Sequence, residues 1–100
     1  MARRLEDSAA KLAALGHPVR LGVLREVVKG PKEGTPAGDL QARLGIPAST
    51  LSHHLATLSG AGLVQSERVG TFVLYRADFK TLRALTDYLW EDCCGGGNCC

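Results

Sequence analysis

Four cysteines are the residues of this 100-residue chain whose type and spacing best fit a chemical role. All four lie in the last eight residues, as the adjacent pairs Cys93-Cys94 and Cys99-Cys100. Because they are clustered in one segment, they cannot staple a small fold together as the disulfides of secreted domains do. In a reducing compartment such a cluster more often serves metal binding or redox chemistry. The cluster therefore predicts a thiol site at the end of the chain.

The ligand chemistry of this segment favours an ion that prefers sulfur. Thiolates are soft ligands, and trivalent arsenic or antimony takes three of them in a pyramid. Cys93 and Cys94 can close a chelate ring on one centre, and residues 95–98 (GGGN) let the chain fold back. Either Cys99 or Cys100 then supplies the third thiolate. The wider cysteine spacing of structural zinc sites is missing, but cadmium, lead or zinc sensing and a thiol redox response stay open as alternatives.

Composition and charge limit the other classes of function. Twelve Lys and Arg against ten Asp and Glu give a net charge of +2, which permits nucleic-acid binding without requiring it. No apolar run is long enough to span a membrane, and the first residues (MARRLED) lack the apolar core of a secretory signal. We therefore expect a cytoplasmic protein with no membrane partner. We do not expect an enzyme, because no nucleophile stands with an oriented base.

Hydrophobic periodicity predicts the elements that must position such a site. Four helices are expected first, then a hairpin of two strands, then a last helix. The order α-α-α-α-β-β-α is that of a winged helix-turn-helix fold, mostly α with one β-hairpin. The predicted helices cover about residues 5–14, 18–29, 35–44, 48–60 and 78–92, and the strands cover residues 64–69 and 72–77.

Local signals indicate where these elements begin and turn. Pro18 suits the first turn of the second helix, and Thr35 is expected to cap the third helix with Pro36 at its first position. Gly70 supplies the positive φ of a tight hairpin turn, and Asp78 is expected to cap the last helix. In the second helix the apolar residues expected on one face are Leu21, Leu24, Val27 and Val28.

The fourth predicted helix has the two faces that a DNA-reading helix needs. Leu51, Leu55 and Leu58 form a buried stripe, and the other face carries small polar groups that fit the major groove. A solvated polar face is the ordinary alternative, but the helix-turn-helix followed by a hairpin favours double-stranded operator DNA. The predicted DNA contacts are Ser49, Thr50, Ser52, His53, His54 and Thr57 of this helix, with Arg68 and Thr71 at the tip of the wing.

The two adjacent histidines are expected to differ in environment. Neighbouring residues of a helix diverge by about 100°, so one ring should point outward and the other should lie nearer the core. The same divergence argues against a metal site formed by the pair.

Three segments resemble the ArsR/SmtB family of metalloregulatory repressors. Residues 12–21 (LAALGHPVRL) are similar to the opening signature of that family, residues 48–55 (ASTLSHHL) to its recognition helix, and residues 58–64 (LSGAGLV) to the exit into the wing. The resemblance covers about residues 5–92. It implies a homodimer built mainly through the first and last helices, which represses transcription from operator DNA and is released when an inducer ion binds.

The resemblance also bears on the sensor site. Some arsenic-responsive members carry cysteines in the third helix, but residues 37–42 (AGDLQA) have none. Some zinc-responsive members use Asp and His pairs on the last helix, which here has Asp78 and Asp87 but no histidine. The C-terminal thiols resemble those of other arsenic-responsive members.

These observations predict two parts with separate roles. Residues 1–92 are expected to form the DNA-binding and dimerisation domain, and residues 93–100 a metalloid-binding tail. The expected inducer is As(III) or Sb(III), with no organic cofactor. Two other classes stay open: a winged-helix regulator that ignores thiophilic ions, and a thiol enzyme or metallochaperone that binds no DNA.

Overall fold

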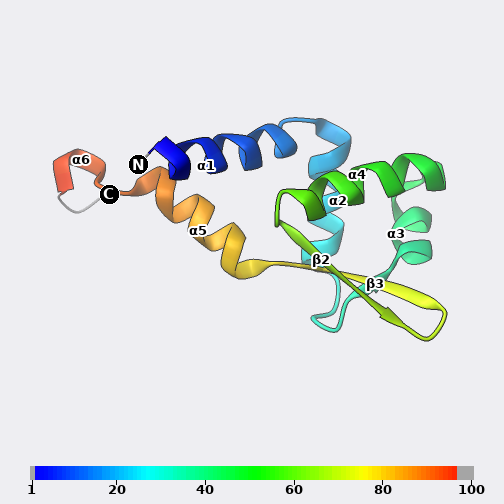
Figure 1. Cartoon of the computed structure of the whole chain (residues 1–100). Helices are drawn as coiled ribbons and strands as arrows, with labels where there is room; N and C mark the ends of the chain where they lie inside the picture. The colour runs from blue at the N-terminus through cyan, green and yellow to red at the C-terminus, as the bar shows by residue number, and fades with distance from the viewer. Residues whose placement is uncertain (1, 97–100) are drawn as a thin grey trace.

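The computed structural model describes residues 2–96 (Figure 1), and within them the chain forms six helices and three strands. The predicted order of five helices and a hairpin is confirmed, with a short strand and a short helical turn in addition. Within the same residues, no helix has both the length and the apolar content needed to cross a membrane. The elements are α1 (Ala2–Leu15), α2 (Pro18–Lys29), β1 (Thr35–Pro36), α3 (Ala37–Leu44), α4 (Ala48–Gly60), β2 (Val64–Val69), β3 (Phe72–Ala77), α5 (Phe79–Trp90) and α6 (Cys93–Gly96).

The hydrophobic core lies between α2, α3, α4 and the base of the hairpin. The predicted stripe of α4 is confirmed, since Leu51, Leu55 and Leu58 are each at most 2% exposed. In α2 the expected face is wrong in one position, because Val23 is buried and Leu21 is 43% exposed. The buried face of α2 is the one that contacts α3, α4 and β3 together, and Leu21 lies off that face.

Residues Thr35 and Pro36 correct a second expectation. They do not begin the third helix but form strand β1, which pairs antiparallel with β3 and gives the sheet order β1-β3-β2. Pro36 fits an edge strand because it has no backbone N–H to donate. Thr35 is buried and its side chain lies directly against Gly30, where no Cβ would fit. The pairing with β3 therefore overrides the local capping signal.

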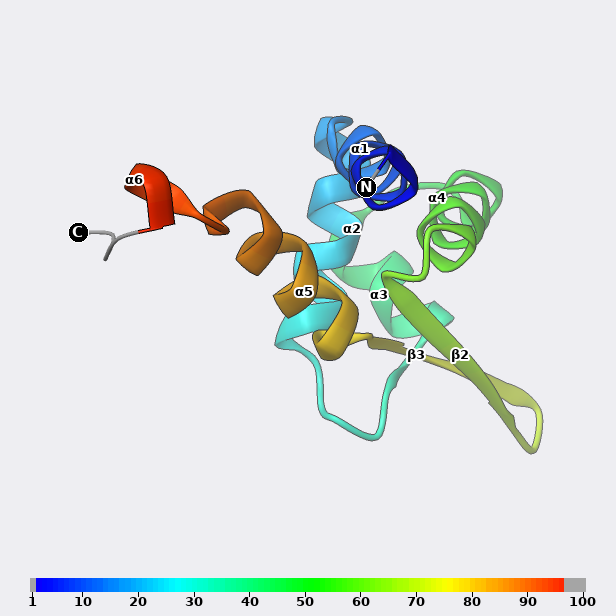
Figure 2. The same ribbon diagram turned by 60° about the vertical axis from the view of Figure 1, so that its left-hand side comes forward.

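The hairpin follows the prediction closely. Strands β2 and β3 pair antiparallel from Val64↔Ala77 to Val69↔Phe72, and Gly70 turns the chain with φ 63°. Figure 2 shows this hairpin extending away from the helices, as the wing of a winged-helix fold does. The tip of the hairpin therefore lies far from the hydrophobic core (Figure 2).

The last helix begins as predicted and ends earlier. The carboxylate of Asp78 caps α5 by accepting a hydrogen bond from the Thr81 N–H at 3.0 Å, and it also accepts one from Gln65 Nε2 at 2.8 Å. These bonds hold the pKa of Asp78 below its usual value. Helix α5 ends at Trp90 rather than at residue 92, and the chain then turns into α6.

Helices α1 and α5 carry apolar side chains that the single chain leaves uncovered. In α5 only Leu85 is buried, whereas Trp90 is 68% exposed. The other large apolar residues exposed on these two helices are Leu5, Leu12, Phe79 and Leu89. Exposed apolar groups on neighbouring elements often mark an interaction surface.

Candidate nucleic-acid interface and thiol tail

The outer face of α4 carries the small polar side chains that the sequence predicts for it. Ser49, Ser52 and His53 are exposed, and Thr50 and Thr57 are half-buried. The Thr57 hydroxyl donates to the carbonyl of His53 at 3.1 Å, so its oxygen is left to accept from a partner. This face is free of bulky groups, which suits a helix that enters the major groove.

His54 departs from the other predicted contacts, because its side chain is only 6% exposed. Its ring points inward, and Nδ1 accepts a hydrogen bond from Nε of Arg20 at 3.2 Å. This placement counts against the DNA contact that the sequence predicts for His54. The expected divergence of the two adjacent histidines is confirmed, with His53 as the exposed member and His54 as the buried one.

A polar cluster beneath α4 was missed by sequence reasoning. Arg20 of α2 donates through Nε to His54 and through Nη1 to the carbonyl of Ala14 at 3.4 Å. The rings of His17 and His54 lie 5.0 Å apart, and His17 Nδ1 accepts from the Arg20 N–H at 3.5 Å at the start of α2. Arg20 thus ties the end of α1 and the start of α2 to the helix that carries the predicted DNA contacts. The signal in the sequence was the motif His17-Pro18-Val19-Arg20, but its partner lies 34 residues away.

The environment of His54 favours its neutral form. Burial lowers the pKa of His54 most, and the positive charge of Arg20 and the nearby His17 and His53 lower it further. The hydrogen bond from Arg20 also requires an unprotonated Nδ1. Protonation would replace this acceptor with a donor that faces the guanidinium.

We expect the free energy of unfolding to fall as the pH drops below about 6.5, the ordinary pKa of histidine. The pKa of His54 is lower in the folded chain than in the unfolded chain, so the unfolded chain takes up the proton first. The stability is therefore fully present above about pH 6.5 and is lost as the pH falls toward the folded pKa. Urea unfolding at several pH values between 7.5 and 5.5 measures this loss.

The matched variant is His54→Asn, whose Oδ1 can accept from Arg20 without titrating. Its stability should depend less on pH over the same window than that of the wild type, because the other two histidines are common to both proteins. Equal pH dependence in the two proteins would exclude His54 as the source.

The wing places its predicted contacts at an exposed tip. Arg68 and Thr71 are both exposed, and in the part of the chain that the structure describes Arg68 forms no ion pair. Farther down the hairpin Arg76 binds Glu67 at 3.0 Å. Arg68 therefore keeps its charge available for a phosphate or a minor groove.

The thiol tail is described only in part. Cys94 is a free, exposed cysteine and Cys93 is half-buried and disulfide-bonded. Cys99 and Cys100 lie outside the described residues. No group of three His, Cys, Asp or Glu side chains suited to a metal occurs within residues 2–96. The metalloid site predicted on Cys93, Cys94 and one of the last two cysteines stays a prediction.

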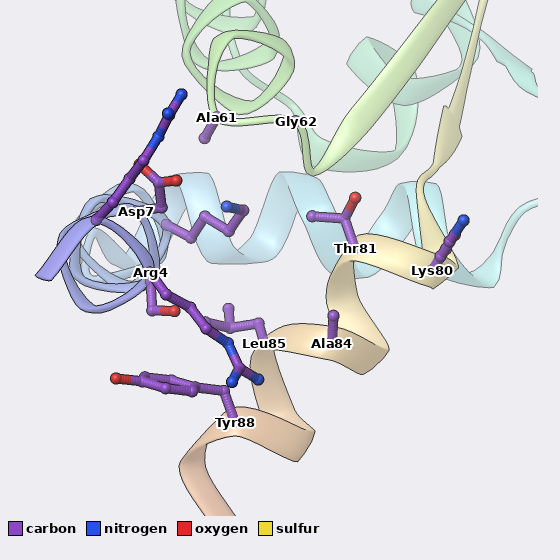
Figure 3. Close-up of a pocket in the computed structure, with 12 residues that line it drawn as sticks. Arg4, Asp7, Ala61, Gly62, Lys80, Thr81, Ala84, Leu85 and Tyr88 are labelled. Atoms are coloured by element: carbon purple, nitrogen blue, oxygen red, sulfur yellow. The ribbon is translucent and has the colours of Figure 1, made fainter. Parts of the chain in front are cut away.

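A cavity of about 820 Å³ lies between α1, α5 and the turn after α4 (Figure 3). Leu85 lines it from α5, and Ala61 and Gly62 line it from the turn after α4. The charged residues around it are Arg3, Arg4, Asp7, Lys11 and Lys80. The cavity shows that α1 and α5 are not packed tightly together along their length.

The arrangement of two short helices, a polar helix face and an exposed wing is that of a winged helix-turn-helix DNA-binding protein. Residues 15–67 match the family model described as a helix-turn-helix domain. The chain belongs to this family, as an ArsR-like transcriptional regulator.

Two relatives indicate the same class of protein. The chain is 38% identical over 80 residues to the HTH-type transcriptional regulator YgaV of Escherichia coli strain K12. The matched region covers 80% of this chain and 79% of the relative. It is 31% identical over 94 residues to the biofilm growth-associated repressor of Xylella fastidiosa strain Temecula1, covering 94% of this chain and 80% of the relative. Both are regulators rather than enzymes by description.

Three solved structures share the fold. An ArsR-like transcriptional regulator from Rhodococcus sp. RHA1 has a TM-score of 0.78 and 29% identity, covering 86% of this chain and 78% of that one. A homodimeric winged helix-turn-helix DNA-binding domain from Mycobacterium bovis has a TM-score of 0.72 and 28% identity, with coverage of 91% and 84%. A possible transcriptional regulator for arsenical resistance has a TM-score of 0.65 and 31% identity, with coverage of 80% and 83%.

Proposed function

We propose that the chain is a homodimeric repressor that binds operator DNA through α4 and the wing, and that As(III) or Sb(III) bound to its C-terminal thiolates releases it. The observation that carries the proposal is the position of the two cysteines, which bind the ion once they are reduced. Cys93 and Cys94 follow the end of α5 by only two residues, and α5 is one of the two helices with uncovered apolar side chains. An ion bound there is placed to act on the assembly that presents α4.

The apolar residues of α1 and α5 support the homodimer. A chain of 100 residues buries a modest share of its surface by itself, so a second copy that covers Leu5, Leu89 and Trp90 would stabilise it. The similar domain from Mycobacterium bovis is described as homodimeric. A twofold dimer presents two copies of α4 to half-sites about 34–36 Å apart on DNA.

The descriptions of two similar proteins support the proposed repression and release. The Xylella fastidiosa relative is described as a repressor, which supports repression by this chain. One similar structure is described as a possible regulator for arsenical resistance, which supports a metalloid as the inducer. A ligand shifts the DNA-binding equilibrium only by its different affinity for the two forms, so the ion-bound form must fit the operator less well.

The test is a titration of the reduced protein on a fluorescent operator duplex with sodium arsenite. Arsenite and antimonite are expected to release the duplex at lower concentration than zinc, cadmium or lead, because a three-thiolate pyramid suits the metalloids. Failure of all five ions to change the affinity would refute an ion-sensing role and leave a regulator that ignores thiophilic ions. Release of the duplex by zinc alone would refute the proposal that the inducer is a metalloid.

The disulfide at Cys93 favours a second candidate, a redox-responsive repressor. In this candidate an oxidant takes two electrons and two protons from a pair of thiols, and the disulfide changes the affinity for operator without any ion. Operator affinity measured for the oxidised and the fully reduced protein, both in a chelator, separates the two candidates. Equal affinities would exclude the redox candidate.

A further inference from the structure

One ion pair joins the two ends of the folded chain beside the thiol tail. Arg4 near the start of α1 binds Glu91 just after α5 through both carboxylate oxygens, with Nη1 to Oε1 at 3.0 Å and Nη2 to Oε2 at 2.8 Å. The same guanidinium lies over the ring of Tyr88, 4.6 Å from its centroid (Figure 3). We call this three-residue arrangement the Arg4–Glu91 clamp.

The geometry of the clamp distinguishes it from an ordinary surface pair. Exposed ion pairs usually contribute little, but a bidentate arginine–carboxylate pair has a defined orientation, and the aromatic face of Tyr88 adds a second contact to the same cation. The cavity between α1 and α5 leaves few packing contacts between these helices nearby. The clamp is therefore a specific tie between α1 and the end of α5.

The backbone connects this tie directly to Cys93, which is disulfide-bonded in this structure, and to the free thiol of Cys94. Glu91 is two residues before Cys93, and the residue between them, Asp92, has a left-handed backbone with φ 57°. Cys94 is left-handed as well, with φ 56°. Residues with a side chain adopt this conformation at a cost in free energy, so the segment has a strained arrangement that it can leave.

Chelation by two adjacent cysteines constrains these same torsions. Both sulfurs must point at one centre, which sets the backbone at Cys93 and Cys94 and with it the direction in which Asp92 and Glu91 leave α5. The carboxylate of Glu91 accepts one hydrogen bond from Arg4 at 3.0 Å and makes a second ion-pair contact with it at 2.8 Å, and this two-point contact depends on the direction of the carboxylate. A tail that closes on an ion is thus placed to withdraw Glu91 from Arg4.

We infer that the Arg4–Glu91 clamp transmits the binding of an ion at the tail thiols to α1. The inference rests on the proposed function. With the clamp closed, α1 is held against the end of α5 and the protein binds operator. With an ion on the thiols, the clamp opens, α1 is released, and the dimer built on α1 and α5 presents its two α4 helices less well to DNA.

The experiment compares the wild type with Glu91→Gln, Arg4→Gln and the double variant. A matched control is Asp87→Asn, which removes a carboxylate from the same helix and breaks the exposed Arg83–Asp87 pair without touching α1. Operator affinity of each reduced protein is measured by fluorescence anisotropy with and without sodium arsenite. Equilibrium dialysis measures arsenite binding in parallel.

Arsenite should weaken operator binding by at least about fivefold in the wild type and in the Asp87→Asn control, the lower end of common allosteric couplings. In Glu91→Gln and Arg4→Gln the affinity without arsenite should already be reduced, and arsenite should change it by less than about twofold, although dialysis shows arsenite bound. The double variant should match the single variants, because both remove one shared interaction.

The outcomes separate the clamp from the function on which it rests. A wild type that binds operator but does not respond to arsenite refutes the metalloid proposal and the clamp together. A wild type that responds, with Arg4→Gln responding by the same factor, refutes the clamp alone. Loss of arsenite binding in Arg4→Gln would also refute it, because Arg4 would then contribute to the ion site rather than relay its occupancy.

Discussion

Replacement of Ser52 by glutamate is expected to weaken operator binding by about 100-fold or more. Ser52 lies exposed in the N-terminal half of α4, where a carboxylate would face base edges and the phosphates that border the groove. Charges of the same sign held together at an interface cost several kcal/mol, and each 1.4 kcal/mol corresponds to a factor of ten in affinity. Anisotropy titrations of a labelled operator duplex at fixed salt measure the change.

Ser59→Glu is the matched control for this change. Ser59 has the same residue type on the same helix and is also exposed, but it lies in the last turn. In helix-turn-helix proteins the N-terminal part of the recognition helix contacts the bases, so Ser59→Glu should lower the affinity far less. Unfolding curves should show that both variants stay folded. Equal losses in the two variants would argue that α4 does not enter the groove in this orientation.

Replacement of both Cys93 and Cys94 by serine is expected to abolish the response to arsenite. The chelate ring needs two thiolates, and a neutral hydroxyl is a hard, weak ligand that stays protonated near neutral pH. The factor by which arsenite lowers operator affinity should fall from at least about fivefold to one. Affinity in the absence of arsenite should stay unchanged, because both residues lie beyond α5 and outside the predicted DNA contacts.

Single variants at the end of the tail complete this test. Cys99→Ser and Cys100→Ser should differ from each other if only one of these residues is the third ligand. Equal, partial losses would indicate that either can serve. A full arsenite response in the Cys93→Ser/Cys94→Ser protein would contradict the tail as the sensor and redirect attention to a site within the folded domain.

The parts of the fold that sequence reasoning predicted correctly depend on neighbours along the chain. The two wing strands, the turn at Gly70 and the cap at Asp78 follow from short-range alternation, backbone preference and a side chain that reaches three residues ahead. The stripe of Leu51, Leu55 and Leu58 follows from the helical period. Such signals can be recognised in the sequence because the interacting groups lie close together along the chain.

The wrong or missing predictions concern contacts between distant residues. Thr35 carried a local capping signal, yet its backbone pairs with Tyr75 and becomes a strand. His54 has the polar character of its helix neighbours, yet its ring lies inside the fold, where it accepts a hydrogen bond from Arg20 of another helix. Helical periodicity alone could say that the two histidines diverge, but the packing of α2 against α4 decided which one is buried.

By itself the sequence determined the order of five helices and a hairpin and the polar face of α4, because residue type and spacing are enough for each. Only the tertiary structure decided which polar side chains form hydrogen bonds inside the fold and which stay exposed and able to contact DNA. It also brought Arg4 to Glu91 across 87 residues, a contact with no local signature. The physical reason is that burial and pairing depend on the summed packing of several elements, which no single segment encodes.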